Sequence, residues 1–262
     1  MEQSSDQHPH PPLSPLGYLA EVRRVTEHIE RTQLPAVTEA GALIAASIAA
    51  GGVLQAFGTG HSEALAMELC GRAGGFVPSN KLALRDLIIH GGEPADYLAD
   101  PKIERIEGLS RRIYALANIE PQDVFVIASS SGGNGTIVEM AEHVTSRGHK
   151  LIAITSLEHT SRITPRHPSG KRLKDFADVV LDNGAPYGDA VLPLPGGAGT
   201  VCGISSIGNT IVGQAMIAEA VRILTEQGVE PPVYISANAA GGDLHNDALE
   251  ARYAGRIRPS AA

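Results

Sequence analysis

The chain has 262 residues, of which 43% are hydrophobic and 19% charged, and these proportions suit one globular domain. Its formal net charge of −8 disfavours a nucleic-acid-binding protein, because such proteins usually present a basic face. The two cysteines form no zinc framework, and no signal peptide or membrane-spanning run is present, so we expect buried free thiols in a cytoplasmic protein without membrane contact.

Residues 1–15 are polar and carry three prolines, which predicts a disordered tail before a single domain over residues 16–262. Apolar residues then recur at helical spacing, and Pro35 can begin a second helix. An alternation of strands and helices follows. Its predicted elements are strand 53–57, helix 62–72, a weak edge strand 76–78, helix 102–117, strand 124–128, helix 136–146, strand 151–155 and strand 178–182.

This alternation lacks hairpin turns, so it predicts a parallel sheet with helices on both faces, a three-layer α/β sandwich. The carboxyl-terminal part differs from it. Residues 184–200 are rich in glycine and proline and predict a long loop, whereas residues 201–227 predict a long helix. Residues 233–236 predict one more strand.

Two glycine-rich loops each join a predicted strand to a predicted helix. The first has the sequence GTGHS at residues 58–62. Glycines allow a close approach of the backbone to a ligand, and a helix start offers unpaired N–H groups. The third glycine of a dinucleotide-binding GxGxxG motif is absent, since Glu63 stands there. A tight turn in which Ser62 caps the helix is the alternative interpretation.

The second loop has the sequence SSSGGNGT at residues 129–136. Three consecutive serines with glycines are more donors than a helix cap needs. Hydroxyls and backbone amides can bind a phosphate without formal charge, which suits an acidic protein. The alternative is a flexible loop that caps a helix. The phosphate- or sugar-binding candidates of both loops are Gly58, Thr59, Gly60, Ser62, Ser129, Ser130, Ser131, Gly132 and Asn134.

These two loops and the LIAITS segment at residues 151–156 resemble the sugar isomerase (SIS) domain family over residues 35–225. Ser129-Ser130-Ser131-Gly132 matches the Ser-x-Ser-Gly hallmark of that family. The family usually has a hydroxyl residue two positions after this glycine, where this chain has Asn134, so one phosphate contact departs from the pattern.

The resemblance implies a five-stranded parallel sheet of flavodoxin-like order 2-1-3-4-5, with both loops beside one ligand. It also implies a sugar phosphate as the ligand, and homodimers or homotetramers with sites near subunit interfaces. A closer likeness is to uncharacterised phosphosugar-binding relatives that share the strings RHxSGKRL and SANxxGGDxHN, found here at residues 166–173 and 236–246.

The resemblance also suggests residues for catalysis. Residues 67–72 are similar to a stretch of the sedoheptulose-phosphate isomerases in which the glutamate is catalytic, and that glutamate is Glu68 here. Aldose–ketose isomerisation needs a base and an acid, for which Glu68 with His61 or His245 are the candidates. A surface ion pair between Glu68 and Arg72 is the structural alternative. The metal-binding histidine of the heptose enzymes is replaced by Ala64, so we expect no metal and no cofactor.

Two further features have weaker functional interpretations. Ser205 and Ser206 begin the predicted carboxyl-terminal helix near the expected sugar site, and helix capping is the alternative for them. A basic stretch around His167 is expected to be a solvated loop, with phosphate or carboxylate recognition as the other interpretation.

Three functions remain open from the sequence. The first is a phosphosugar isomerase that uses Glu68 and a histidine of the same or of a neighbouring subunit. The second is a binding module that senses a phosphosugar without turnover. The third is a lyase or etherase acting on an amino-sugar phosphate, because SIS relatives include such enzymes. A dinucleotide-dependent oxidoreductase is disfavoured by the missing third glycine.

Overall fold

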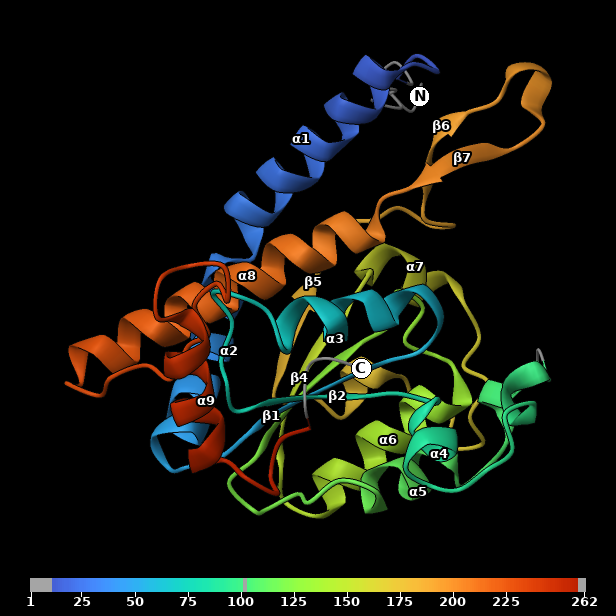
Figure 1. Ribbon diagram of the computed structural model, residues 1–262. Helices are drawn as coiled ribbons and strands as arrows, with labels where there is room; N and C mark the ends of the chain where they lie inside the picture. Colours follow the sequence, from blue (N-terminus) through green and yellow to red (C-terminus); the bar gives the residue numbers. More distant parts are fainter. Residues whose placement is uncertain (1–10, 101–102, 259–262) are drawn as a thin grey trace.

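The computed structural model describes residues 11–100 and 103–258 (Figure 1). Helix α1 (Pro15–Thr32) begins directly after Ser14, whose hydroxyl accepts a hydrogen bond from the Gly17 N–H at 3.0 Å. The first ten residues of the predicted tail lie outside the described residues, and Pro15 already belongs to α1.

Five parallel strands form the central sheet, and they stand in the order β2-β1-β3-β4-β5. The predicted strand order 2-1-3-4-5 is therefore confirmed. The strands are β1 (Leu54–Gly58), β2 (Ser79–Leu82), β3 (Val124–Ala128), β4 (Lys150–Thr155) and β5 (Val179–Asp182).

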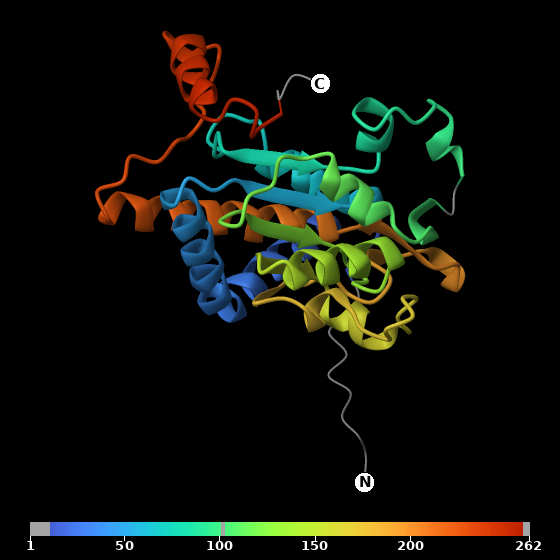
Figure 2. The ribbon, with the colours of Figure 1, turned by 90° about the horizontal axis from the view of Figure 1, so that it is seen from below.

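Helices cover both faces of this sheet, as predicted (Figure 2). Alternate strand residues face opposite sides because side chains repeat every second position along a strand. Leu54 and Ala56 thus join one hydrophobic core, whereas Phe57 joins the other. The first core lies under α2 (Leu34–Ala49), α3 (Glu63–Leu69) and α8 (Ser205–Glu226). The second lies under α4 (Asp86–Ile89), α5 (Leu109–Ala115) and α6 (Gly135–Ser146).

The segment predicted as a long loop over residues 184–200 contains a β-hairpin instead. Its strands are β6 (Ala190–Pro193) and β7 (Thr200–Gly203), joined around the 3-10 turn η5 (Pro195–Gly197). Figure 1 shows the hairpin and α1 projecting together from one side of the sheet. Because β7 takes residues 200–203, α8 begins at Ser205 and not at residue 201. Cys202 on β7 is exposed, so the prediction of a buried thiol is wrong for it, and Cys70 is half-buried.

Other boundaries also differ from the prediction. The helix expected over residues 102–117 is divided at Gly108, whose φ of 84° suits glycine, into the 3-10 turn η3 (Ile103–Arg105) and α5. No strand forms at residues 76–78 or 233–236, where only Phe76 and Val233 pair as an isolated bridge. The remaining elements are η1 (Gly60–Ser62), η2 (Tyr97–Ala99), α7 (Leu157–Arg162), η4 (Leu173–Asp175) and the unpredicted α9 (Gly242–Arg252).

Candidate functional site

The first glycine-rich loop leaves β1 and passes through η1 into α3. A side chain at Gly58 would place its Cβ 2.5 Å from the Ser62 carbonyl oxygen, and Gly60 has a φ of +56°, so both positions require glycine. Ser62 makes no capping hydrogen bond to the start of α3. The simple alternative, in which this serine is the helix cap, is therefore not what the structure shows.

The second loop leaves β3 and enters α6. Gly132 has a φ of +60°, and a Cβ there would lie 3.1 Å from Thr160 Oγ1. The hydroxyls of Thr155 and Thr160 donate to the carbonyl oxygens of Ser130 and Ser131, at 3.2 Å and 2.7 Å. Residues of β4 and α7 thus hold this loop in one shape. One of its serine hydroxyls bonds within the loop, since Ser129 Oγ accepts a hydrogen bond from the Gly132 N–H at 3.1 Å.

Three backbone N–H groups of the second loop have no acceptor among the residues that the structure describes. The hydrogen bonds within the described residues leave the amides of Ser130, Ser131 and Asn134 unused. The loop continues into α6, whose first turn adds further unpaired N–H groups. This concentration of donors without any lysine or arginine in the loop is typical of a site for an anion.

The two loops are neighbours at the carboxyl edge of the sheet, because Gly58 of β1 pairs in register with Ala128 of β3. Glu104 of η3 lies between them. Its carboxylate accepts a hydrogen bond from the Asn134 side-chain amide, and its Oε1 is 3.8 Å from where a Cβ on Gly60 would stand. The structure thus brings the two predicted loops together and adds a carboxylate.

The sequence interpretation missed Glu104. This residue lies near the start of the segment predicted as helix 102–117, thirty residues before Asn134, which its carboxylate contacts. The Thr136 hydroxyl donates to the Glu104 carbonyl oxygen at 2.7 Å, which ties η3 to the start of α6. The residues around Glu104 form no sequence pattern from which its contact with the second loop could be predicted.

Glu68 lies on α3, on the side that meets α8. Its carboxylate pairs with Arg72 one turn later and accepts a hydrogen bond from Gln214 Nε2 at 2.8 Å. The Glu68 side chain is 24% exposed. The ion pair that the sequence offered as the structural alternative is therefore present.

The histidine candidates lie apart from each other. His61 is exposed within the first loop. His245 is on α9, where its Nε2 lies 3.1 Å from the Val233 carbonyl oxygen. Val233 bridges to Phe76, which precedes β2, so this contact is at the amino edge of the sheet. Within one chain, the structure does not bring His245 to the loops.

Ser205 and Ser206 begin α8, as expected, but a carboxylate already occupies the helix start. Asp189 accepts hydrogen bonds from the N–H groups of Ile204 and Ser205 at 3.0 Å and 2.7 Å, and from the Ser205 hydroxyl at 3.0 Å. The helix start is thus capped by Asp189, and the Ser205 hydroxyl donates to that carboxylate but does not itself cap the helix. Ser206 is exposed.

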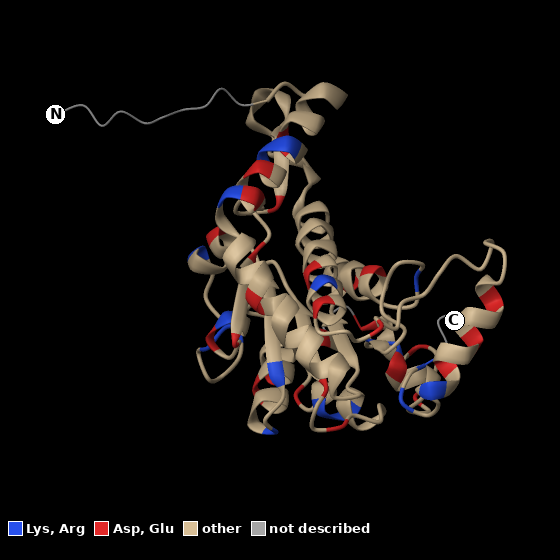
Figure 3. Cartoon of the chain, turned by 90° about the vertical axis from the view of Figure 1, so that its left-hand side faces the viewer, with Lys and Arg blue, Asp and Glu red and all other residues tan. Residues whose placement is uncertain are grey.

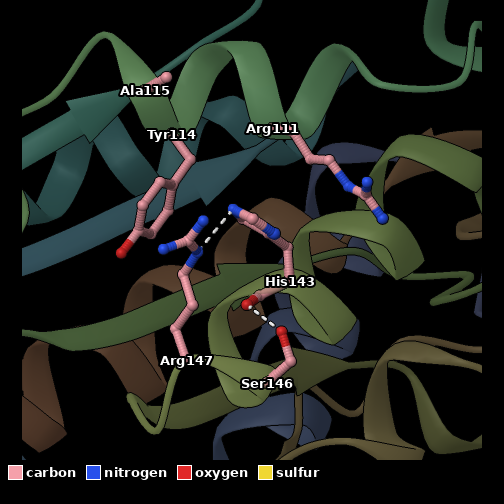
Figure 4. Close-up of a pocket in the computed structure, with 6 residues that line it drawn as sticks. All are labelled: Arg111, Tyr114, Ala115, His143, Ser146 and Arg147. Atoms are coloured by element: carbon pink, nitrogen blue, oxygen red, sulfur yellow. Dashed lines mark hydrogen bonds between the residues drawn. The ribbon is translucent and has the colours of Figure 1, made fainter.

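Two cavities lie on the side of the sheet covered by α5 and α6. One of about 580 Å³ adjoins the second loop at Gly135 and is also lined by Arg166 and His167 of the basic stretch. The other, of about 530 Å³, lies farther along α5 and α6 (Figure 4). There Arg147 Nε donates to His143 Nε2 at 3.1 Å, and burial followed by the charges of Arg147 and Arg111 lowers the pKa of His143.

Charged residues of both signs are interspersed over the elements in the view of Figure 3, and no basic face is visible there. Among the described residues, no helix combines the length and the apolar character needed to cross a bilayer.

Comparison with known proteins identifies relatives over most of the chain. Residues 17–156 match the model of the SIS domain family. A UPF0309 protein of Listeria monocytogenes serovar 1/2a is 42% identical over 242 residues, which cover 92% of this chain and 98% of the relative. A UPF0309 protein of Halalkalibacterium halodurans is 38% identical and covers 88% of this chain and 93% of its own length.

Solved structures share the fold at low sequence identity. A phosphoheptose isomerase from Francisella tularensis superposes with a TM-score of 0.53 at 15% identity, over 79% of this chain and 96% of its own. A phosphosugar isomerase assigned to capsule formation in Bacteroides fragilis gives 0.51 at 18% identity, over 81% and 92% of the two chains. From the family match and the shared sheet, we conclude that the chain belongs to the SIS domain family and, within it, to the UPF0309 proteins.

Proposed function

We propose that this protein binds a sugar phosphate at the carboxyl edge of the sheet, with the phosphate held by the second loop. The observation that carries the proposal is the set of unused N–H groups at Ser130, Ser131 and Asn134 before the start of α6. A phosphate dianion needs several donors that converge on its oxygens. The hydroxyls of Ser131 and Thr59 and the first loop then lie beside the sugar.

We further propose that the bound sugar phosphate is isomerised between its aldose and ketose forms. A base removes the proton from C2 of the open-chain aldose, and the electron pair forms an enediolate with C1. The proton returns to C1 as the carbonyl group forms at C2, and the proton of the C2 hydroxyl passes to the C1 oxygen. A glutamate is ionised at neutral pH and suits the proton-accepting role.

Two glutamates are candidates for this base. Glu104 lies between the two loops, so a sugar attached to a phosphate in the second loop would pass near its carboxylate. Glu68 has the support of the family resemblance, but it reaches the sugar only if the substrate extends toward α8 or belongs to a neighbouring subunit. His61, exposed in the first loop, is our candidate for moving the proton that opens the sugar ring.

Glutamine variants at both positions test this chemistry. We expect Glu104→Gln to lower turnover at least 100-fold, because general base catalysis commonly contributes 10²–10⁴-fold. Affinity for the sugar phosphate should change only a few-fold. Proton NMR in deuterated buffer, across a panel of aldose phosphates, measures ketose formation together with deuterium entry at C2.

The control is Glu107→Gln, an exposed glutamate of the same segment. Loss of turnover in Glu68→Gln instead would identify Glu68 as the base and preserve the isomerase. If the wild-type protein binds a sugar phosphate but forms no ketose and exchanges no deuterium with any of the panel, isomerisation is contradicted and a sensing module remains.

A further inference from the structure

A cavity of about 470 Å³ lies beside the edge strand β2, between α3, α4 and the carboxyl-terminal segment. Its size falls within the usual range for small-molecule sites, roughly 300–1,000 Å³. Four cationic side chains line it, although the chain as a whole carries a net charge of −8. They are Arg72, Lys81, Arg85 and Arg258.

Three of these cations have carboxylate partners. Arg258 pairs with Asp86 in a largely buried contact, whose side chains are 19% and 6% exposed. Arg72 pairs with Glu68, and Arg85 with Glu63. These two arginines are 47% and 44% exposed, so their guanidinium groups can turn toward a bound ligand at little cost.

Lys81 is the cation without compensation. No acidic side chain within residues 11–100 and 103–258 pairs with it. The neighbouring Cys70 provides no negative charge, because burial raises the pKa of its thiol to about 12. The cavity is therefore lined by a half-buried lysine that lacks a carboxylate partner among the described residues, because the Asp86 carboxylate that also lines it pairs with Arg258.

The string at residues 236–246 helps to build this cavity. Asn246 bonds the Ile235 N–H and carbonyl groups at 3.1 Å and 3.0 Å, and His245 Nε2 contacts the Val233 carbonyl. Tyr234, held between them, lines the cavity and donates to Glu250 at 2.8 Å. These residues lie beyond the part that matches the SIS domain model, so the SIS core alone does not form the cavity.

We propose that this cavity is a second anion site, which binds a small phosphorylated molecule with Lys81 as its central cation and Arg72 and Arg85 as closing contacts. The site is separate from the two glycine-rich loops, and the inference goes beyond the proposed function and stands without it. A bound phosphate would draw Arg72 from Glu68 and Arg85 from Glu63. Both glutamates lie on α3, the helix that follows the first loop, so occupancy would alter the charge beside that loop.

Calorimetric titration with inorganic pyrophosphate tests the site. Ser131→Asp places a carboxylate in the second loop and removes phosphate binding there. We expect Ser131→Asp to retain one binding event per chain. Adding Lys81→Met should weaken this event at least tenfold, since charge-assisted contacts are the strong ones. Lys150→Met, at an exposed lysine that begins β4, should leave it unchanged.

Arg85→Gln, added to Ser131→Asp in the same way, should also weaken pyrophosphate binding. It provides a second test of the site should Lys81→Met impair folding. Pyrophosphate binding that disappears in Ser131→Asp alone, or that survives Lys81→Met and Arg85→Gln unchanged, would overturn the second site. If binding occurs but is the same in wild type and Ser131→Asp, the loop proposal fails whereas the second site stands.

Discussion

Gly132 and Gly148 show how differently two glycines of positive φ can be constrained. Gly132 has a φ of +60° and is enclosed by the hydroxyls of Thr155 and Thr160. Gly148 has a φ of +85° at the end of α6, and a Cβ there would meet nothing within 4 Å. Both positions disfavour other residues by about 1–2 kcal/mol, but only the first also lacks space.

We therefore predict that Gly132→Ala lowers the free energy of unfolding more than Gly148→Ala does. Gly148→Ala should cost about 1 kcal/mol, and Gly132→Ala should cost more and also weaken phosphate binding, because the second loop must shift. Urea unfolding measures the first effect and calorimetry the second. Equal costs with unchanged binding would show that the loop is not held as tightly as the contacts indicate.

The two loops were predictable from sequence because their glycines and serines are contiguous and stand between strand and helix patterns. Glu104 was not predictable, since its place depends on how η3 packs against the start of α6. For the same reason the sequence could assign Asn134 to phosphate binding but could not foresee that its amide contacts Glu104.

Among the elements, the five strands were identified because their apolar runs are nearly continuous, as in buried parallel sheets. The hairpin of β6 and β7 was missed because its glycines and prolines dominate the composition. Asp189 and Cys202 have φ values of 70° and 65°, conformations that tertiary contacts support and that local propensity does not favour. Helix α9 is short and largely exposed, so it lacks a clear apolar periodicity.

The junction of α5 with β3 and β4 contains a buried histidine with a consequence for pH dependence. His149 is 5% exposed, and its Nε2 lies 2.8 Å from the Tyr114 hydroxyl while Nδ1 lies 3.3 Å from the Asp123 carbonyl oxygen. A neutral ring satisfies both contacts by accepting from Tyr114 and donating to Asp123. Burial lowers the pKa of His149, so the folded state resists its protonation.

We predict that this junction loses stability as the pH falls. In the unfolded state His149 gains its proton near pH 6.5, whereas in the folded state it gains the proton only at lower pH. Between these two pH values the unfolded state therefore binds more protons than the folded state. The free energy of unfolding should thus fall below pH 6.5 by up to about 1.4 kcal/mol per pH unit from this group.

Urea unfolding at several pH values between 5.5 and 7.5 checks this dependence. His149→Gln should reduce the slope, and His90→Gln, at an exposed histidine that ends α4, should not. A slope that His149→Gln leaves unchanged would assign the pH dependence to other groups.

At the scale of the whole molecule, the protruding α1 and hairpin suggest how copies would associate. Leu16 and Leu19 on α1 are 73% and 48% exposed, and Val201 on β7 is 38% exposed. The Tyr18 hydroxyl donates to the Gly203 carbonyl oxygen at 3.1 Å, which holds α1 and β7 together. We propose that this apolar surface is covered by a second copy of the chain.

Light scattering after gel filtration tests that assembly. One chain has a mass of 27.4 kDa, and we expect a measured mass of at least two chains. The double variant Leu16→Glu, Leu19→Glu should shift the measured mass toward that of the single chain. Leu244→Glu, at an 80% exposed leucine on α9, is the control and should not change the mass. A wild-type protein that elutes as a single chain would contradict the assembly.

Whether the two loops form a sugar-phosphate site can be measured by thermal unfolding with a panel of sugar phosphates. Each sugar phosphate is paired with its unphosphorylated sugar. A ligand at 100 times its dissociation constant stabilises the folded state by about 2.7 kcal/mol, which is readily measured. We predict that at least one sugar phosphate raises the melting temperature while its parent sugar does not, and that Ser131→Asp removes the effect. No shift with any sugar phosphate, or equal shifts with the parent sugars, would contradict the claim.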